Sequence, residues 1–161
     1  MPVITVDKDL DALTLTMVAE FDAPIERVWR IWEDPRQLER WWGPPTWPAT
    51  FTRHDFTVGG ESRYYMTGPD GETSAGWWEM TKIDAPHHLE LQDGFADDDG
   101  EPLRESMVTT MSAAFEDLGG RTRMTTVNTF KDAEEYEKIL AMGMEEGMTL
   151  AVGQIDALLA G

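Results

Sequence analysis

Cysteine is absent from the chain and basic residues are scarce, and each shortage excludes classes of protein. Without cysteine among its 161 residues, the chain cannot form thiol nucleophiles, Fe–S clusters or cysteine-type zinc sites. Thirteen Lys and Arg residues stand against 31 Asp and Glu residues, which gives a net charge of −18. Such a charge repels phosphate backbones, so we expect no nucleic-acid partner. Two interpretations of the acidic surface stand: a solvated, highly soluble surface, or an adaptation to high salt.

Long apolar runs are missing as well. No stretch approaches the roughly 20 apolar residues that cross a membrane. The N-terminal stretch MPVITVDKDLDALTLT carries acidic residues where a signal peptide would be basic. We therefore expect a soluble, cytoplasmic protein without membrane insertion. Length and uniform composition predict a single domain over residues 1–161, large enough to bury its own core.

Motifs of the common chemistries are also missing. The chain has no G-x-S-x-G, no H-E-x-x-H, no P-loop and no G-x-G-x-x-G. His54 is followed by Asp55, but neighbours on a strand point to opposite faces, so this pair does not predict a joint site. The acidic run DDDGE, residues 97–101, lacks the spacing of an EF-hand and indicates a mobile loop. We expect no metal and no cofactor, and these motifs identify no catalytic residue.

The hydrophobic pattern predicts an α+β fold. Residues 12–21 alternate apolar and polar side chains, as a half-buried strand does, and helical spacing follows over residues 23–34 and, more briefly, 35–42. Turn signals such as PDG and LGG divide residues 49–130 into six further β segments. Residues 132–143 predict a short helix with Asp132 as N-cap, and residues 144–161 have the spacing of a longer helix. About seven antiparallel strands and a C-terminal helix are therefore expected, and the glycines of that helix indicate a bend or a close approach to the sheet or a ligand.

Four segments resemble the AHSA-type domain, a family named for homologues of the activator of heat-shock protein 90 ATPase. They are FDAPIERVWRIWEDPRQLERWWGP, FTVGGESRYYMTGPDGE, DLGGRTRMT and AMGMEEGMTLAVGQIDALLA. The family belongs to the SRPBCC or START helix-grip superfamily, together with the birch pollen allergen and polyketide cyclases. The resemblance implies a helix-grip fold: a curved antiparallel sheet around a long C-terminal helix, two short helices after the first strand, and a cavity between sheet and helix. Related superfamily members bind lipids, hormones or polyketides there, whereas co-chaperone activity belongs to longer proteins with a second domain.

The candidate site combines an aromatic mouth with inward-facing strand positions. Pro44 and Pro45 stiffen the RWWGPPTWP segment, whose tryptophans serve either as a cavity rim or as a core plug. Methionines adapt to irregular apolar ligands, and equally fill gaps in ordinary cores. Polar groups on an inward face need a partner, which is another side chain, water or a ligand. The candidate ligand-binding residues are Trp41, Trp42, Trp47, Tyr65, Trp77, Asp93, Phe95, Met107, Thr109, Met111, Met124, Asn128, Met144 and Met148.

Three functions fit these observations. The first is a binding protein, without an assigned reaction, for a small apolar or amphipathic ligand. The second is a cyclase, hydrolase or isomerase that uses the same cavity, with Asp93 or Glu79 as acid or base. The third is a chaperone-associated interaction module with an exposed aromatic patch, formed by the outward members of the pairs 41/42 and 77/78. The same patch could serve a homodimer interface.

Overall fold

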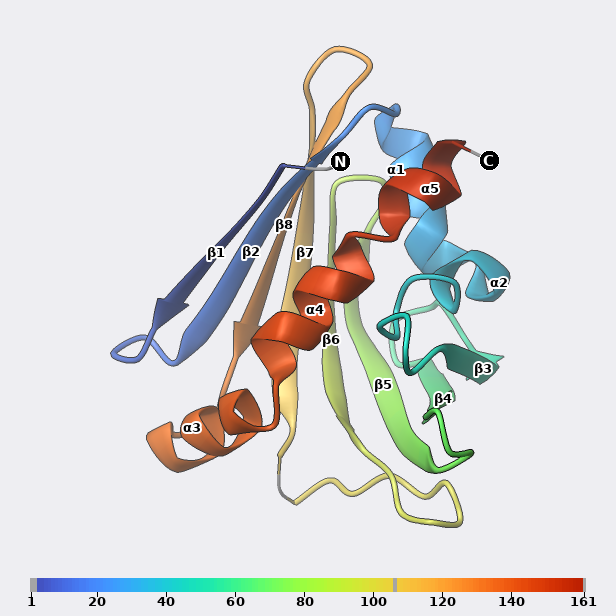
Figure 1. The fold of residues 1–161 in the computed structure, drawn as a ribbon. Coiled ribbons are helices and arrows are strands. Elements are labelled where there is room, and N and C mark those ends of the chain that lie inside the picture. The colour runs from blue at the N-terminus through green and yellow to red at the C-terminus, as the bar shows by residue number, and fades with distance from the viewer. Residues whose placement is uncertain (1–2, 106, 161) are drawn as a thin grey trace.

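The computed structural model describes residues 3–105 and 107–160 as one antiparallel sheet with helices on one face (Figure 1). The strand order is β1-β2-β8-β7-β6-β5-β4-β3, and all neighbours are antiparallel. The elements are β1 (Val3–Asp9), β2 (Thr14–Phe21), α1 (Ile25–Glu33), α2 (Pro35–Leu38), β3 (Ala49–His54), β4 (Glu61–Thr67), β5 (Thr73–Asp84), β6 (His88–Phe95), β7 (Thr109–Asp117), β8 (Thr122–Thr129), α3 (Ala133–Ala141), α4 (Met144–Val152) and α5 (Ile155–Ala160). This is the α+β, helix-grip type of fold that the sequence predicts.

The sheet has eight strands, one more than expected, because β1 lies before the first predicted strand. β1 pairs along its length with β2 and forms one edge of the sheet. Its second half, Asp7, Lys8 and Asp9, is charged. Charged side chains are common on edge strands, where they discourage pairing with another chain. The same charges weaken the apolar alternation by which a strand is recognised in a sequence.

The C-terminal helical region is interrupted twice: the first break agrees with the short helix expected over residues 132–143, and the second divides the longer helix expected after it. Gly143, with a φ of 92°, separates α3 from α4, and residues 153–154 separate α4 from α5. At the second break, the Gln154 side chain donates a hydrogen bond of 2.8 Å to the carbonyl of Gly43. The Arg27 guanidinium on α1 donates to the Leu158 carbonyl on α5 at 3.1 Å. These two bonds hold the end of the chain against the α1–α2 region. Among the described residues, no helix combines the length and apolar character needed to span a bilayer.

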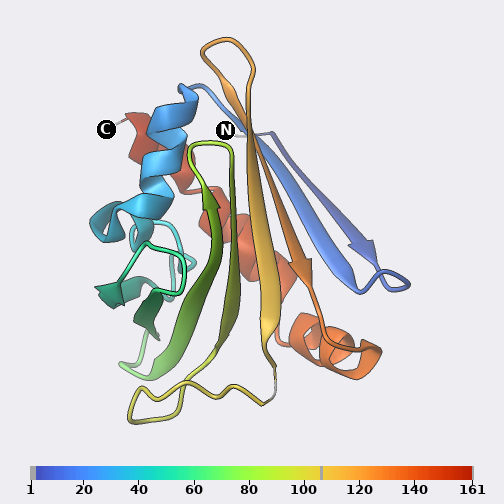
Figure 2. The same ribbon diagram turned by 180° about the vertical axis from the view of Figure 1, so that it is seen from behind.

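Aromatic side chains fill one end of the space between sheet and helices. Trp32 on α1 and Trp78 on β5 are fully buried, and their ring centroids lie 6.0 Å apart. Trp41 packs edge-to-face on Trp32, and its indole N–H donates to the Ile31 carbonyl. His54 bridges the same region, because one ring nitrogen contacts the Ser62 hydroxyl and the other the Trp32 carbonyl. A Trp core therefore forms at the α1–α2 end of the sheet. Within residues 3–105 and 107–160, no helix covers the opposite face of the sheet (Figure 2).

Candidate functional site: a cavity under helix α4

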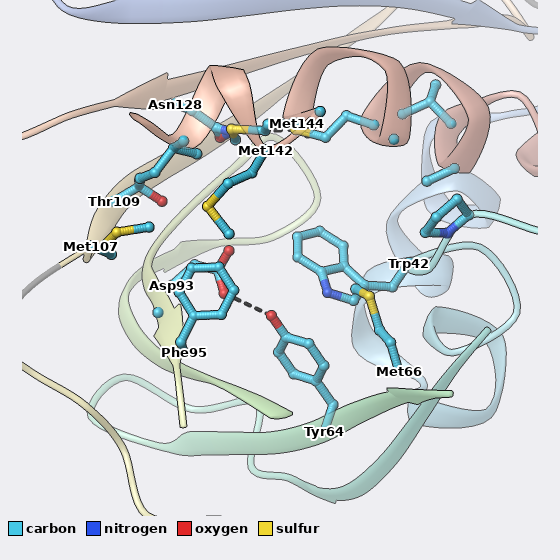
Figure 3. Close-up of a pocket in the computed structure, with 18 of the residues that line it drawn as sticks. Trp42, Tyr64, Met66, Asp93, Phe95, Met107, Thr109, Asn128, Met142 and Met144 are labelled. Atoms are coloured by element: carbon cyan, nitrogen blue, oxygen red, sulfur yellow. Dashed lines mark hydrogen bonds between the residues drawn. The ribbon is translucent and has the colours of Figure 1, made fainter. Parts of the chain in front are cut away.

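A cavity of about 280 Å³ lies between the inner face of the sheet and the α3–α4 segment (Figure 3). The strands β4, β6, β7 and β8 form its floor, and α4 forms its roof. The segment after α2 closes the side next to the Trp core. The lining consists of Trp41, Trp42, Pro44, Tyr64, Met66, Asp93, Gly94, Phe95, Met107, Thr109, Asn128, Ile139, Met142, Gly143, Met144, Gly147, Met148, Ala151 and Val152.

Five methionines contribute to the apolar part of this lining. They are Met66, Met107, Met142, Met144 and Met148. An unbranched thioether has several rotatable bonds and a polarizable sulfur, so it adapts to ligands of irregular shape. Gly147 leaves further room, because a Cβ atom placed there would meet nothing within 4 Å. The roof therefore combines flexible methionine side chains with open space at Gly147.

A carboxyl group and a phenol meet inside the cavity. The Tyr64 hydroxyl on β4 donates a hydrogen bond of 2.9 Å to Asp93 Oδ1 on β6 (Figure 3). Burial raises the pKa of the Asp93 carboxyl from 3.8 to about 7, although the hydrogen bond from Tyr64 acts to lower it. Burial and the nearby Asp93 charge raise the pKa of Tyr64 well above its usual value of 10. Near neutral pH, the cavity therefore holds a carboxyl group that is only partly ionised.

Two more polar side chains continue the floor from Asp93. Thr109 on β7 is the direct cross-strand neighbour of Asp93, and Asn128 on β8 pairs with the position two residues after Thr109. The Asn128 amide nitrogen contacts the Met148 sulfur at 3.4 Å. Among the described residues, its Oδ1 atom is buried without a hydrogen-bond partner. A buried amide oxygen normally has a partner, so this atom indicates a position where a ligand or water binds.

The mouth includes a residue in an uncommon conformation. Met107 has a φ of 60°, which places a non-glycine residue in the left-handed region. Its backbone N–H donates to Glu135 Oε1 on α3 at 2.7 Å. Conformations of this kind persist where the surroundings hold them and cluster at ligand sites. The hydrogen bond from Met107 to Glu135 thereby ties the residues just before β7 to helix α3, next to the cavity that Met107 lines.

The structure brings together nine of the fourteen residues predicted from the sequence. These nine line the cavity: Trp41, Trp42, Asp93, Phe95, Met107, Thr109, Asn128, Met144 and Met148. Two others, Met111 and Met124, point inward as expected from the alternation, but they pack in the main core. They pack in the cluster that contains the buried tryptophans. Alternation along a strand predicts which face a side chain is on, but not where along the strand the cavity lies. Trp47 does not line the cavity either and lies against Gly68 at the β4–β5 turn.

Tyr65 and Trp77 lie on the wrong face of the sheet for the predicted role. Tyr65 is 37% exposed, and its neighbour Tyr64 points inward instead. Trp77 is buried on the outer face, under the Arg104 guanidinium at 4.4 Å. Glu79, the alternative acid or base, also lies on that face and pairs with Arg104 at 3.1 Å. Tyr65 and Trp77 were each assigned to the inner face although they point outward. Since successive side chains of a strand alternate between faces, a shift of one residue moves a side chain to the other face.

Ten lining residues were not among the fourteen candidates: Pro44, Tyr64, Met66, Gly94, Ile139, Met142, Gly143, Gly147, Ala151 and Val152. One signal for Tyr64 exists in the sequence. Gly76 lies opposite it on β5, and a Cβ at Gly76 would come within 2.4 Å of the Tyr64 ring. A glycine opposite an aromatic residue on neighbouring strands indicates that the ring covers the glycine. Met142 offers no such signal, because it follows the last turn of α3 and is 59% exposed while also reaching the cavity.

The chain thus has a helix-grip fold with a cavity between its sheet and its C-terminal helices. Residues 22–160 match the family described as "Activator of Hsp90 ATPase homolog 1-like protein". The chain belongs to this family. No curated protein sequence matches it.

Solved structures agree with this assignment. A solution NMR structure of a protein from Arthrobacter aurescens is 60% identical with a TM-score of 0.93, over 97% of this chain and 91% of that one. The crystal structure of protein Ms6760 from Mycobacterium smegmatis is 51% identical with a TM-score of 0.89, over 98% and 97% of the two chains. The AHSA1 protein from Silicibacter pomeroyi, at 21% identity, 91% and 97% coverage and a TM-score of 0.73, shares the fold.

Proposed function

We propose that this protein binds a small apolar or amphipathic ligand in the cavity under α4. One observation carries the proposal: an apolar cavity of about 280 Å³ contains a few convergent polar groups, Asp93, Tyr64 and Asn128 among them. Small-molecule sites have this composition, in which apolar walls provide affinity and a few polar atoms fix orientation. A ligand that buries about 200 Å² of apolar surface gains roughly 5 kcal/mol before ordering costs.

A cavity-filling substitution tests this proposal. In Gly147→Phe, the new ring enters the space that Gly147 leaves open, so ligand binding is expected to be lost. Gly147→Ala is the matched control, because a methyl group takes little of the volume. Native mass spectrometry of the freshly purified protein, followed by Trp fluorescence titration with apolar metabolites, compares the variants. Saturable binding in the wild type and Gly147→Ala, but not in Gly147→Phe, supports the proposal, whereas equal binding in all three contradicts it.

An enzymatic role is the second candidate, because Asp93 has the pKa of a group that gains and loses protons near neutrality. Asp93 would remove a proton from the ligand and return it, with Tyr64 holding the carboxyl in place. Incubation of a bound ligand in D₂O distinguishes the two roles. Deuterium incorporation that is lost in Asp93→Asn indicates proton transfer, whereas an unchanged ligand mass supports binding alone. Glu79 has no part in this candidate because it lies outside the cavity.

The hypothesis of a protein-interaction module has no exposed aromatic patch among the described residues to support it. It expected an exposed aromatic patch, yet Trp41 and Trp77 are each 1% exposed and Trp78 is fully buried. Trp42 is partly buried and lines the cavity. Trp42 thus faces the cavity and Trp77 lies under Arg104, so neither forms an exposed patch. A homodimer stays a prediction, now without an aromatic patch to form its interface.

A further inference from the structure

We infer that the ligand is a cationic amphiphile, whose positively charged nitrogen binds at Asp93 and whose apolar body lies among the cavity methionines. This inference rests on the proposed function. The charges of the lining carry it: within residues 3–105 and 107–160, Asp93 is the single charged side chain that lines the cavity. No Lys, Arg or His joins it there. A carboxylate held in an apolar space without a cation costs free energy, and a cationic ligand supplies the missing partner.

The surroundings of Asp93 also suit a cation. The Asp93 carboxyl accepts the hydrogen bond from Tyr64 (Figure 3), and the Trp42 indole packs edge-to-face on Tyr64 with ring centroids 6.1 Å apart. Aromatic faces attract ammonium groups, most strongly where water is excluded. The polarizable sulfur atoms of the lining methionines complete a soft, electron-rich wall. A carboxylate among aromatic rings is therefore a site for a positive charge.

The remaining polar side chains on the floor, Thr109 and Asn128, each offer an oxygen that can accept a hydrogen bond. Asn128 is 3% exposed, and its Oδ1 atom lacks a partner although the amide nitrogen contacts the Met148 sulfur. With Asp93 and Thr109 it forms a line across β6, β7 and β8. A ligand with several N–H or O–H donors matches this line. The net charge of −18 adds to the preference, because it attracts cations and repels fatty acids and phosphates.

The test must also distinguish an anionic ligand, which would bind to hydrogen-bond donors in the same cavity. If Asp93 carries a proton, then its hydroxyl and the Tyr64 hydroxyl can both donate to an oxyanion. A matched series of octylamine, octanol and octanoate separates the two arrangements, because the apolar chain is constant and the headgroup changes from cation to neutral to anion. At pH 8 the amine is protonated, since alkylammonium groups such as that of Lys have pKa values near 10.4.

The test is a calorimetric titration of each probe at pH 8 into the wild type, Asp93→Asn and Asp70→Asn. Asp93→Asn keeps the shape of the side chain and an acceptor for Tyr64. Asp70→Asn removes the same unit of charge from an exposed turn and is the matched control. We expect the wild type and Asp70→Asn to bind octylamine at least about tenfold more tightly than octanol, and octanoate most weakly. Asp93→Asn is expected to lose this preference while its octanol affinity is retained.

The outcomes separate the inference from the proposed function. Equal affinity for octylamine and octanol, tightest binding of octanoate, or an unchanged octylamine preference in Asp93→Asn would overturn the cationic assignment and leave cavity binding intact. Failure of all three probes to bind would contradict the proposed function itself, and the inference with it.

Discussion

Replacing Asp93 by Asn should stabilise the protein, and the gain should grow with pH. The folded carboxyl has a pKa raised to about 7, whereas the usual pKa of an Asp carboxyl in an unfolded chain is 3.8. Between these values the folded state binds more protons than the unfolded state, so the stability of the wild type falls as pH rises through this window. Asn has no proton to lose, so the variant escapes this loss, and its side chain still accepts the hydrogen bond from Tyr64.

The magnitude follows from the difference in pKa. A shift of about 3 units corresponds to about 4 kcal/mol once the carboxyl is fully ionised, near pH 8, and to about 2 kcal/mol at pH 5. The advantage of Asp93→Asn over the wild type should therefore increase by about 2 to 3 kcal/mol between pH 5 and pH 8. For a domain of this size, this is a relative rise in Tm of about 4 to 12 °C.

Thermal unfolding of the wild type, Asp93→Asn and Asp70→Asn at several pH values between 5 and 8 measures this change. His54, whose pKa burial lowers, acts in the opposite direction, because its folded form resists protonation and stability falls as pH drops below 6.5. His54 is present in all three proteins, so its effect cancels in the differences. Asp70→Asn should track the wild type at every pH. A constant difference between Asp93→Asn and the wild type across this range would refute the reasoning.

Three further predictions concern the roof, the buried pair and the outer face. Gly147→Ala should raise the free energy of unfolding by about 1 kcal/mol in denaturant titration, because Ala favours the interior of α4 and its methyl group meets open space; a loss of stability would contradict this. Tyr64→Phe should raise the pKa of Asp93 further in a ¹³C carboxyl NMR titration, because it removes a hydrogen bond that lowers it; an unchanged value would show that the bond is not formed. Arg104→Ala should cost about 1 kcal/mol and expose Trp77 to acrylamide quenching while ligand affinity stays constant; a lost affinity would place the outer face in the site.

Most of the fold could be predicted, because its signals are local and regular. Buried side chains alternate regularly along β2, β7 and β8, and the Trp-rich and Gly-rich motifs occur in the order of the family. Edge strand β1 carries little of this signal because its charged residues face solvent. The break at Gly153 depends on a tertiary contact, in which Gln154 reaches the Gly43 carbonyl, so helical spacing alone does not reveal it.

Site residues could be predicted where the alternation along a strand determines which side chains point inward. They could not be predicted where the position along the strand, or the choice between two similar neighbours, determines the outcome. Asp93, Thr109 and Asn128 were identified because each breaks an apolar row on an inward face. Met111 has the same parity, but it packs in the main core together with Trp32 and Trp41. Tyr64 and Tyr65 are equally apolar neighbours, and packing against Gly76 on the next strand decides which ring turns inward.

Methionine methyl NMR tests the central claim, ligand binding in the cavity, most directly. The chain offers five lining methyl groups, at Met66, Met107, Met142, Met144 and Met148. Buried methionines outside the cavity, at Met17, Met80, Met111 and Met124, serve as internal controls. Titration with octylamine or octanol should shift the first set strongly and the second set little. Shifts confined to the second set, or saturable binding that moves none of the five lining methyl groups, would contradict the account.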